Sequence, residues 1–327
     1  MPVKTNIEAL RETMAAEMRR DPTIVITGED VGRRGGVFRA TEGLYAEFGP
    51  SRVIDSPLSE LSIAGVGIGL ALNGIRPICE IQFADFIHPA FNQIVNEAAK
   101  MRYRSNATFT VPMLIRAPYG GGISGALYHS QSIEAFFCHV PGLYVLAPST
   151  PYDTAGLLRT ALRSPDPVLF LEHKKLYRSV KGEVPDGDFF VPVGRADVKA
   201  AGDDLTIISY GLMMHESLKA AEALTREDIS VEVIDLRTLS PLDKDTILTS
   251  VKKTGKVLIV HEDNLTGGLG GEIAAIISEQ AFEHLDGPVT RVAGPDVPAM
   301  PFSHPLQDFF MPDAEKIAAA ARRLAAY

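Results

Sequence analysis

The sequence predicts an α/β protein built from two doubly wound domains, each a parallel β-sheet covered by helices. Short apolar runs of strand length alternate with longer segments of helical spacing, first over residues 24–171 and again over 205–292. Since parallel strands need a crossover connection, usually a helix, this alternation is typical of sheets covered on both faces. The chain has 327 residues, which is long enough for two domains of ordinary size.

The elements of the first domain follow from the spacing of apolar residues. Ile7–Met18 has helical spacing and ends at Asp21-Pro22, and further helices are predicted over residues 90–103 and 152–162. The predicted strands are Arg52–Ile54, Ile24–Thr27, Pro77–Phe83, Pro112–Arg116, Leu143–Leu146 and Val168–Leu171.

A change of composition separates the two domains. Glu172–Arg195 is charged, contains Pro and Gly and lacks helical periodicity. We therefore expect one domain over residues 1–180, a linker over 181–196 and a second domain over 197–327. In the second domain, helices are predicted to begin near residues 214, 243, 270 and 314. Its predicted strands are Leu205–Tyr210, Val231–Ile234, Lys256–Val260 and Val289–Val292.

Composition excludes several classes of function. The net charge is −9 and no cluster of five or more Lys and Arg occurs, which argues against nucleic acid or an anionic membrane surface as a partner. No apolar run is long enough to span a membrane, and the N-terminus lacks the apolar core of a signal peptide. Cys79 and Cys138 lie in apolar surroundings and are predicted to be buried reduced thiols. A cytoplasmic protein is expected.

The most informative stretch is Asp55–Leu70. Ser56 is a plausible N-cap and Pro57 a favourable first helical residue, so a helix is predicted to begin here. Glu60 would then lie in the first turn, where the partial positive charge of the helix end favours a carboxylate. The apolar run that follows contains three glycines, Gly65, Gly67 and Gly69. Each costs about 0.5–1 kcal/mol in a helix relative to Ala, so another backbone or a flat ligand is expected to approach this helix closely.

Two other interpretations of this stretch were considered. A dinucleotide-binding GxGxxG motif starting at Gly65 would require glycine at position 70, where Leu70 stands. Its glycines would also precede the helix rather than follow its start, so this interpretation fails. The second interpretation, that Glu60 only caps the helix, remains open from the pattern alone.

Two further residues are candidates for function. Glu29 follows the strand Ile24–Thr27, and the carboxyl ends of strands are where open α/β sheets place ligands. A turn or capping acid is the alternative. His129 lies in a long glycine-rich loop, where a surface histidine is the alternative. Gly32–Gly36 and Gly267–Gly271 could bind an anion or form ordinary loops.

Seven stretches together resemble the beta subunits of the thiamin-diphosphate-dependent 2-oxo acid dehydrogenases. They occur in the family's order along essentially the whole chain, at residues 28–32, 55–69, 80–86, 126–132, 172–174, 233–238 and 294–296. The resemblance implies a pyrimidine-binding domain followed by a transketolase-type C-terminal domain. It also implies an α2β2 heterotetramer with an alpha subunit, serving a lipoyl acyltransferase core.

The resemblance also assigns roles to single residues. Glu60 matches the glutamate that hydrogen-bonds N1′ of the aminopyrimidine ring, where a carboxylate favours the imino tautomer that can take the weakly acidic thiazolium C2 proton. His129 matches the active-site histidine that assists acyl transfer to the lipoyl group. The implied cofactor-binding residues are Glu29, Leu58, Ser59, Glu60, Gln82 and Phe86, and the implied substrate contacts are Phe83, Phe86 and His129.

Metal sites are implied in the same way. The family binds the diphosphate through Mg²⁺ with a Gly-Asp-Gly motif, which this chain lacks. The resemblance places that motif on the alpha subunit, so the active site is expected at the interface of the two subunits. Relatives also hold K⁺ in the beta subunit, largely through backbone carbonyls, and Ala161, Ser164 and Asp166 match those positions.

The predicted reaction is the oxidative decarboxylation of branched-chain 2-oxo acids with reductive acylation of lipoyl groups. Residues 83–86, 119–132 and 294–301 look more like the branched-chain members than the pyruvate members. A pyruvate or acetoin dehydrogenase subunit is the first alternative. A non-catalytic scaffold is the second, and Glu60 together with His129 argues against it. A single-chain transketolase-like enzyme is disfavoured by the missing diphosphate motif.

Overall fold

The computed structural model describes residues 1–327, which form two compact units. The first unit comprises Met1–Tyr119 and Phe136–Val193, and the second comprises Gly120–Ala135 and Gly194–Tyr327. The segment that carries His129 therefore belongs to the second unit, although it lies within the first half of the sequence. None of the helices combines the length and apolarity needed to cross a membrane.

Six strands of the first unit lie side by side in the order β6-β7-β5-β4-β2-β3, and all their pairings are parallel. A separate antiparallel pair is formed by β1 (Val3–Thr5) and β8 (Lys181–Glu183), the second of which lies in the predicted linker. The parallel strands are β2 (Ile24–Gly28), β3 (Val53–Asp55), β4 (Arg76–Glu80), β5 (Leu114–Tyr119), β6 (Tyr144–Leu146) and β7 (Val168–His173).

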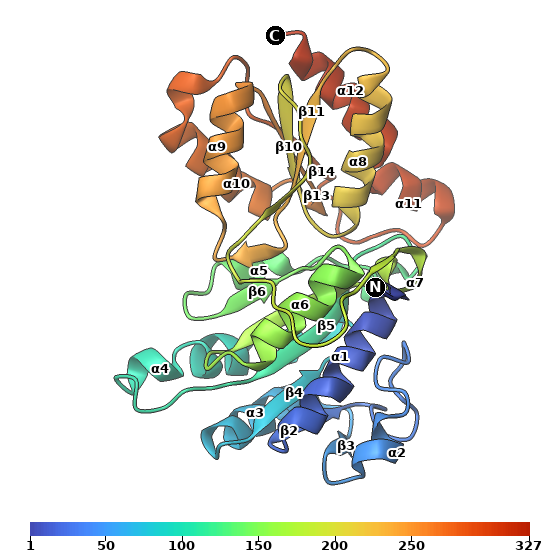
Figure 1. The fold of residues 1–327 in the computed structure, drawn as a ribbon, viewed down its shortest axis with the longest axis vertical. Coiled ribbons are helices and arrows are strands. Elements are labelled where there is room, and N and C mark those ends of the chain that lie inside the picture. The colour runs from blue at the N-terminus through green and yellow to red at the C-terminus, as the bar shows by residue number, and fades with distance from the viewer. The chain divides into compact units, whose positions relative to one another are not determined.

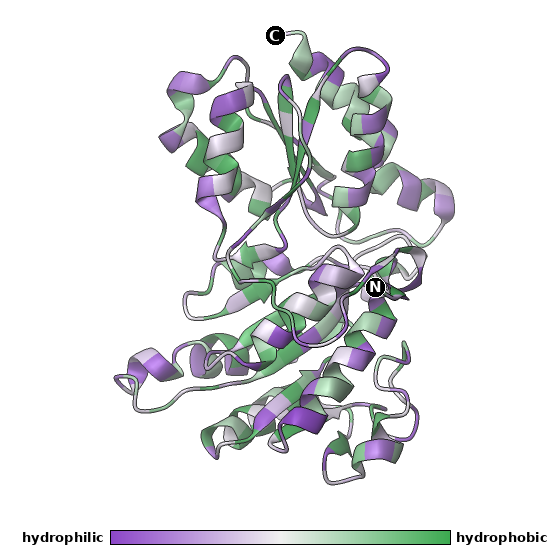
Figure 2. Cartoon of the chain, in the orientation of Figure 1, coloured by the Kyte–Doolittle hydropathy of each residue, from purple (hydrophilic) through white to green (hydrophobic).

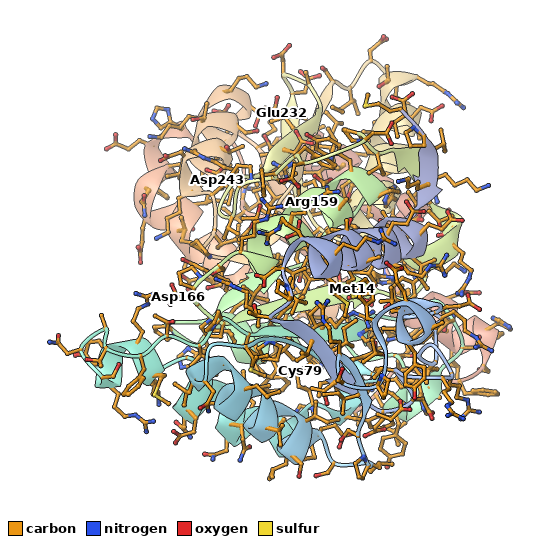
Figure 3. The ribbon with its side chains drawn as sticks, turned by 60° about the horizontal axis from the view of Figure 1, so that its bottom comes forward. Met14, Cys79, Arg159, Asp166, Glu232 and Asp243 are labelled. Carbon is orange, nitrogen blue, oxygen red and sulfur yellow. The ribbon has the colours of Figure 1, made fainter.

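Helices cover both faces of this sheet. α1 packs against α6 on one face (Figure 1), where Met14 (labelled in Figure 3), Leu157 and Phe170 share one hydrophobic core. α3 contacts β4 on the other face, because successive strand side chains alternate and Cys79 faces α3. The helices that begin before residue 180 are α1 (Asn6–Arg20), α2 (Leu44–Phe48), α3 (Glu60–Leu72), α4 (Met101–Arg104), α5 (Glu134–Cys138), α6 (Pro151–Leu162) and α7 (Leu176–Ser179).

Three local predictions differ from the structure. The helix predicted over residues 90–103 is interrupted: a 3₁₀ turn at His88–Ala90 leads to a π-helical segment at Gln93–Ala98, and only Met101–Arg104 follows as α-helix. Apolar spacing does not distinguish the wider π-helical turn from an α-helix. The stretch 172–195 is also partly regular, since it includes α7 and β8. Cys138 is half-buried rather than buried, and both cysteines are free thiols.

The second unit has a sheet in the order β14-β13-β10-β11-β9, parallel except for the antiparallel edge strand β9. α8 and α12 cover one face, and α9 and α10 cover the other (Figure 1). The strands are mostly hydrophobic along their whole length, whereas the helices carry a hydrophilic side (Figure 2), as expected for a sheet buried between two helical layers.

The predicted strands and helices of this unit are present. Edge strand β9, the short strand β12 and helix α11 are not among the predicted elements; β9 (Asp-Val-Lys-Ala) is not the buried apolar run that marks a central strand. The strands are β9 (Asp197–Ala200), β10 (Leu205–Ser209), β11 (Val231–Asp235), β12 (Thr238–Ser240), β13 (Val257–Asn264) and β14 (Thr290–Gly294). The helices are α8 (Leu212–Thr225), α9 (Lys244–Thr254), α10 (Leu269–Gln280), α11 (His304–Phe310) and α12 (Ala314–Ala325).

Candidate functional site

The carboxyl ends of β2, β3 and β4 present polar side chains at one edge of the first sheet. Gly32 N–H donates to Asp55 Oδ1 at 2.6 Å, which ties the loop after β2 to the end of β3. Gln82, just beyond β4, donates from Nε2 to Asp30 Oδ2 at 3.4 Å. This edge is where open α/β sheets bind ligands. The structure therefore brings the segments that carry Glu29 and Gln82 together there.

Helix α3 begins at Glu60, later than predicted from Ser56 and Pro57. The Ser56 N–H donates to the carbonyl of Gly28 at 2.8 Å, so the chain stays bound to β2 beyond the end of β3. Ser59 is the N-cap instead, and its hydroxyl accepts from the Ser62 N–H at 3.3 Å. Ser59, not Glu60, therefore supplies the N-cap, and Glu60 is the first residue of the helix.

Glu29 and Glu60 form a pair of nearby carboxylates, each only 8% exposed. Burial raises the pKa of Glu29, and the negative charge of Glu60 adds to that rise. A hydrogen bond from the Ser59 main chain opposes it. Glu29 Oε1 is buried without a hydrogen-bond partner, which is costly unless a ligand or a proton satisfies it. The pair is suited to bind a group that brings a donor or shares a proton.

Aromatic side chains lie next to these polar groups. The Phe83 ring makes edge-to-face contacts with Phe38 and Phe86, at centroid separations of 5.3 and 5.7 Å. The Lys174 ammonium lies 5.8 Å from the centroid of the Phe83 ring. By contrast, the Leu58 side chain is 81% exposed.

The three glycines of α3 have different structural roles. A Cβ at Gly67 would lie 2.4 Å from Cys79 Sγ (labelled in Figure 3), so this glycine allows the helix to pack on the sheet. No atom lies within 4 Å of a Cβ at Gly69, and only Gln93 does so at Gly65. These two lie on the outer side of the helix, where Val66 is 56% exposed.

Burial raises the pKa of the Cys79 thiol to about 12, so it is inert.

A buried ionic network underlies this edge, and the sequence interpretation missed it. Arg116 donates to Glu172 through Nε at 2.7 Å and Nη2 at 2.5 Å, and through Nη1 to Glu80. Tyr177 donates its hydroxyl to Glu172. Glu80 Oε1 would lie 3.3 Å from a Cβ at Gly36, so the network supports the glycine-rich loop. The sequence does carry a signal for this network. Each of three apolar strands has a charged residue at or near its carboxyl end, and the charges on neighbouring strands are opposite.

His129 belongs to the second unit, whereas the other candidate residues belong to the first. It is half-buried and follows the 3₁₀ turn Ala126–Tyr128. Ser124 and Ala126 have positive φ values of 54° and 56°, which non-glycine residues seldom adopt. A Cβ at Gly125 would lie 2.6 Å from the His129 carbonyl oxygen, so only glycine allows this turn. The loop that presents His129 is thus tightly built.

The residues matched to a potassium site are engaged with other protein groups. The carbonyl oxygen of Ser164 accepts from Arg76 Nη1 at 3.0 Å, and the carbonyl of Ala161 accepts from the Ser164 N–H at 3.1 Å. The Asp166 carboxylate (labelled in Figure 3) accepts from Arg102 Nε at 2.5 Å. K⁺ would have to compete with the Arg76 guanidinium here, and the site stays a prediction. No group of three or more His, Cys, Asp or Glu side chains is arranged to hold a metal ion.

Comparison with known proteins gives the family. The transketolase pyrimidine-binding domain matches residues 4–180, and the transketolase C-terminal domain matches residues 194–317. The 2-oxoisovalerate dehydrogenase subunit beta of Bacillus subtilis (strain 168) is 56% identical over 327 residues, covering 100% of both chains. The chain belongs to the beta subunits of the 2-oxo acid dehydrogenase E1 components.

Two other relatives agree with this assignment. The pyruvate dehydrogenase E1 component subunit beta of the same organism is 47% identical over 324 residues, covering 99% of both chains. A solved structure, described as a split-gene transketolase in an inactive beta4 tetramer, superposes with a TM-score of 0.79 at 26% identity, covering 98% of each chain. The family and the two-domain transketolase-like α/β fold predicted from the sequence of this E1 beta subunit are therefore confirmed.

Proposed function

We propose that this E1 beta subunit, in a cytoplasmic α2β2 heterotetramer with an alpha subunit, oxidatively decarboxylates branched-chain 2-oxo acids and acylates the lipoyl groups of an acyltransferase core. The observation that carries the substrate class is the identity of 56% to a 2-oxoisovalerate dehydrogenase subunit, against 47% to a pyruvate dehydrogenase subunit from the same organism. Both comparisons span nearly the whole chain.

The residues at the edge of the first sheet fit thiamin diphosphate. The aminopyrimidine ring is flat and carries donors and acceptors on its rim, and the edge offers aromatic side chains with two buried carboxylates. Glu60 would hold a proton at N1′ of that ring, and the exposed Leu58 would lie against it. When bound, the cofactor supplies the carbon that attacks the 2-oxo group and stores the resulting electron pair.

The second carboxylate has a supporting role in this proposal. Burial and the negative charge of Glu60 raise the pKa of Glu29, and its buried, unpartnered Oε1 needs a donor. Gln82, held by Asp30, and Phe86 would complete the cofactor surface. Phe83 and Phe86 would provide the apolar wall for a branched side chain, because each buried methylene contributes about 0.8 kcal/mol.

An alpha subunit is proposed to supply the rest of the site. The chain has no Gly-Asp-Gly motif for Mg²⁺ and diphosphate. It also leaves an apolar surface uncovered beside the two carboxylates, where Leu58 and Leu61 are 81% and 47% exposed. Gly65 and Gly69 on the outer side of α3 would permit close approach by a partner backbone. A scaffold without catalysis would have no need of a buried carboxylate with an unsatisfied oxygen.

The substrate assignment is tested by specificity in the assembled enzyme. The chain is co-expressed with its alpha subunit, and kcat/KM is measured for 3-methyl-2-oxobutanoate and for pyruvate. Discrimination by a methylene-sized difference is typically about 10–200-fold, so a ratio of at least ten in favour of the branched acid is expected. A ratio below one would reject the branched-chain assignment in favour of a pyruvate or acetoin enzyme.

A further inference from the structure

One buried carboxylate ties together the two ends of the loop that carries His129. Glu262, in β13 of the second unit, is only 4% exposed. Its Oε1 accepts from the Gly121 N–H at 2.7 Å and from the Ser132 hydroxyl at 3.2 Å. Because both ends of the loop meet at one oxygen atom, Glu262 closes the loop at its base.

A second buried side chain holds the loop part-way along. Gln307, in α11, is 5% exposed, and its Oε1 accepts from the Ser124 N–H at 2.9 Å. Ser124 has φ of 54°, a conformation that persists in a non-glycine residue only when its surroundings hold it. The Gln307 amide therefore holds the loop at a point where the backbone is strained, five residues before His129.

The loop packs closely on two methionines of the unit at Gly121. A Cβ at Gly121 would lie 2.6 Å from both Met300 Cε and Met311 Sδ, so the backbone there is already in close contact. Within the loop, Gln131 Nε2 donates to the Leu127 carbonyl at 3.0 Å. This bond closes the turn between residues 127 and 131, which lies between the contacts at the two ends of the loop.

We propose that Glu262 and Gln307 are positioning residues for His129, acting through hydrogen bonds to the main chain at Gly121 and Ser124 and to the Ser132 hydroxyl. Together they accept three hydrogen bonds from the loop and so attach it to β13 and α11. This inference rests on the proposed function, in which His129 assists acyl transfer. A displacement of about 1 Å in a reacting group can cost about 10²-fold in rate, so the precision of this support matters.

The test uses the assembled α2β2 enzyme and two pairs of matched variants. Glu262→Leu and Gln307→Leu remove the acceptors, whereas Glu262→Gln and Gln307→Glu keep an oxygen at the same place. Ser132→Ala removes one bond only and serves as the mildest variant. Two activities are measured, decarboxylation with an artificial electron acceptor and acylation of a free lipoyl domain. Hydrogen exchange is followed in the peptide 120–132.

We expect both leucine variants to lose about 10–100-fold in lipoyl acylation while dye-linked decarboxylation changes by less than about threefold. Exchange in the peptide 120–132 should accelerate, and the conservative variants should restore both readouts. Equal loss in the two activities, or unchanged exchange, would overturn the inference. If the leucine variants fail to assemble, the same two activities and the exchange of the peptide 120–132 are measured in Ser132→Ala and decide between the same outcomes.

His129→Ala, measured in parallel, separates this inference from the proposed function. If His129→Ala loses acylation more than decarboxylation but Glu262→Leu does not, only the positioning role of Glu262 is overturned. If His129→Ala lowers both activities equally, the proposed role of His129 is wrong. In that case hydrogen exchange alone decides whether Glu262 and Gln307 hold the loop.

Discussion

Replacing Arg116 by Met should destabilise the first unit more than any other single change in its sheet. Arg116 is completely buried and is the only cation in contact with the carboxylates of Glu80 and Glu172 in the network described above. Methionine fills most of the space but leaves two buried negative charges without a partner. Breaking a buried ion pair in this way typically costs about 3–5 kcal/mol, a large part of the roughly 5–15 kcal/mol that stabilises a protein.

The two carboxylates should respond differently from the arginine. The wild-type network holds two acids and one base, so Glu80→Gln brings its net charge to zero and leaves the Glu172 contacts intact. We expect it to cost less than about 1.5 kcal/mol, because an amide oxygen can still accept from Arg116. Glu172→Gln should cost more, since Glu172 accepts two bonds from Arg116 and one from Tyr177.

The assay is urea unfolding of the purified chain at pH 8 and pH 5.5, with hydrogen exchange in β4, β5 and β7 to locate the effect. Burial raises the pKa of Glu80, and Arg116 opposes that rise. Without Arg116 the pKa of Glu80 is free to rise and this acid can take up a proton at low pH, so the loss of stability should be smaller at pH 5.5 than at pH 8. Arg226→Met, which removes an exposed ion pair with Glu222, is the control. A loss below about 1 kcal/mol for Arg116→Met at pH 8 would refute the reasoning.

Four further predictions concern catalysis and pH. Glu60→Gln should allow assembly but reduce turnover about 10²–10⁴-fold, and near-normal dye-linked turnover would contradict its proposed role. His129→Ala should reduce lipoyl acylation far more than dye-linked decarboxylation, as comparison of the two rates will show. The isolated chain should lack decarboxylase activity and bind thiamin diphosphate weakly, which micromolar Mg²⁺-dependent binding by calorimetry would disprove. Burial, with the negative charge of Asp263, raises the pKa of Glu134 to about 8. Because this folded-state pKa exceeds the unfolded value, the stability from Glu134 is complete below about pH 4.3 and is lost as the pH rises through about 8. Glu134→Gln keeps an acceptor for the Tyr210 hydroxyl, so its stability relative to wild type should rise from pH 5 to pH 8, whereas parallel thermal unfolding profiles would contradict this.

Local patterns were sufficient for most of the fold because they are properties of short segments. The buried strands β2 and β7 begin with continuous apolar runs, and β5 is apolar apart from Arg116, as expected for a sheet covered on both faces. Helix α1 was placed correctly within two residues at each end, since its apolar spacing and the following Asp21-Pro22 both act locally. The start of α3 was misplaced because the hydrogen bond between Ser56 and Gly28 joins residues that are far apart in sequence.

The sequence by itself determined the family, the order of the elements and the candidates Glu29, Glu60 and His129, because these depend on residue type and spacing. Only the tertiary structure decided how those residues are supported. It placed Glu29 beside Glu60, with one oxygen left unsatisfied. It also assigned the His129 loop to the second unit and placed Glu262 at its base. Residues 121 and 262 lie far apart along the chain, and no periodicity or local motif encodes such a contact; it exists only once the sheets have formed.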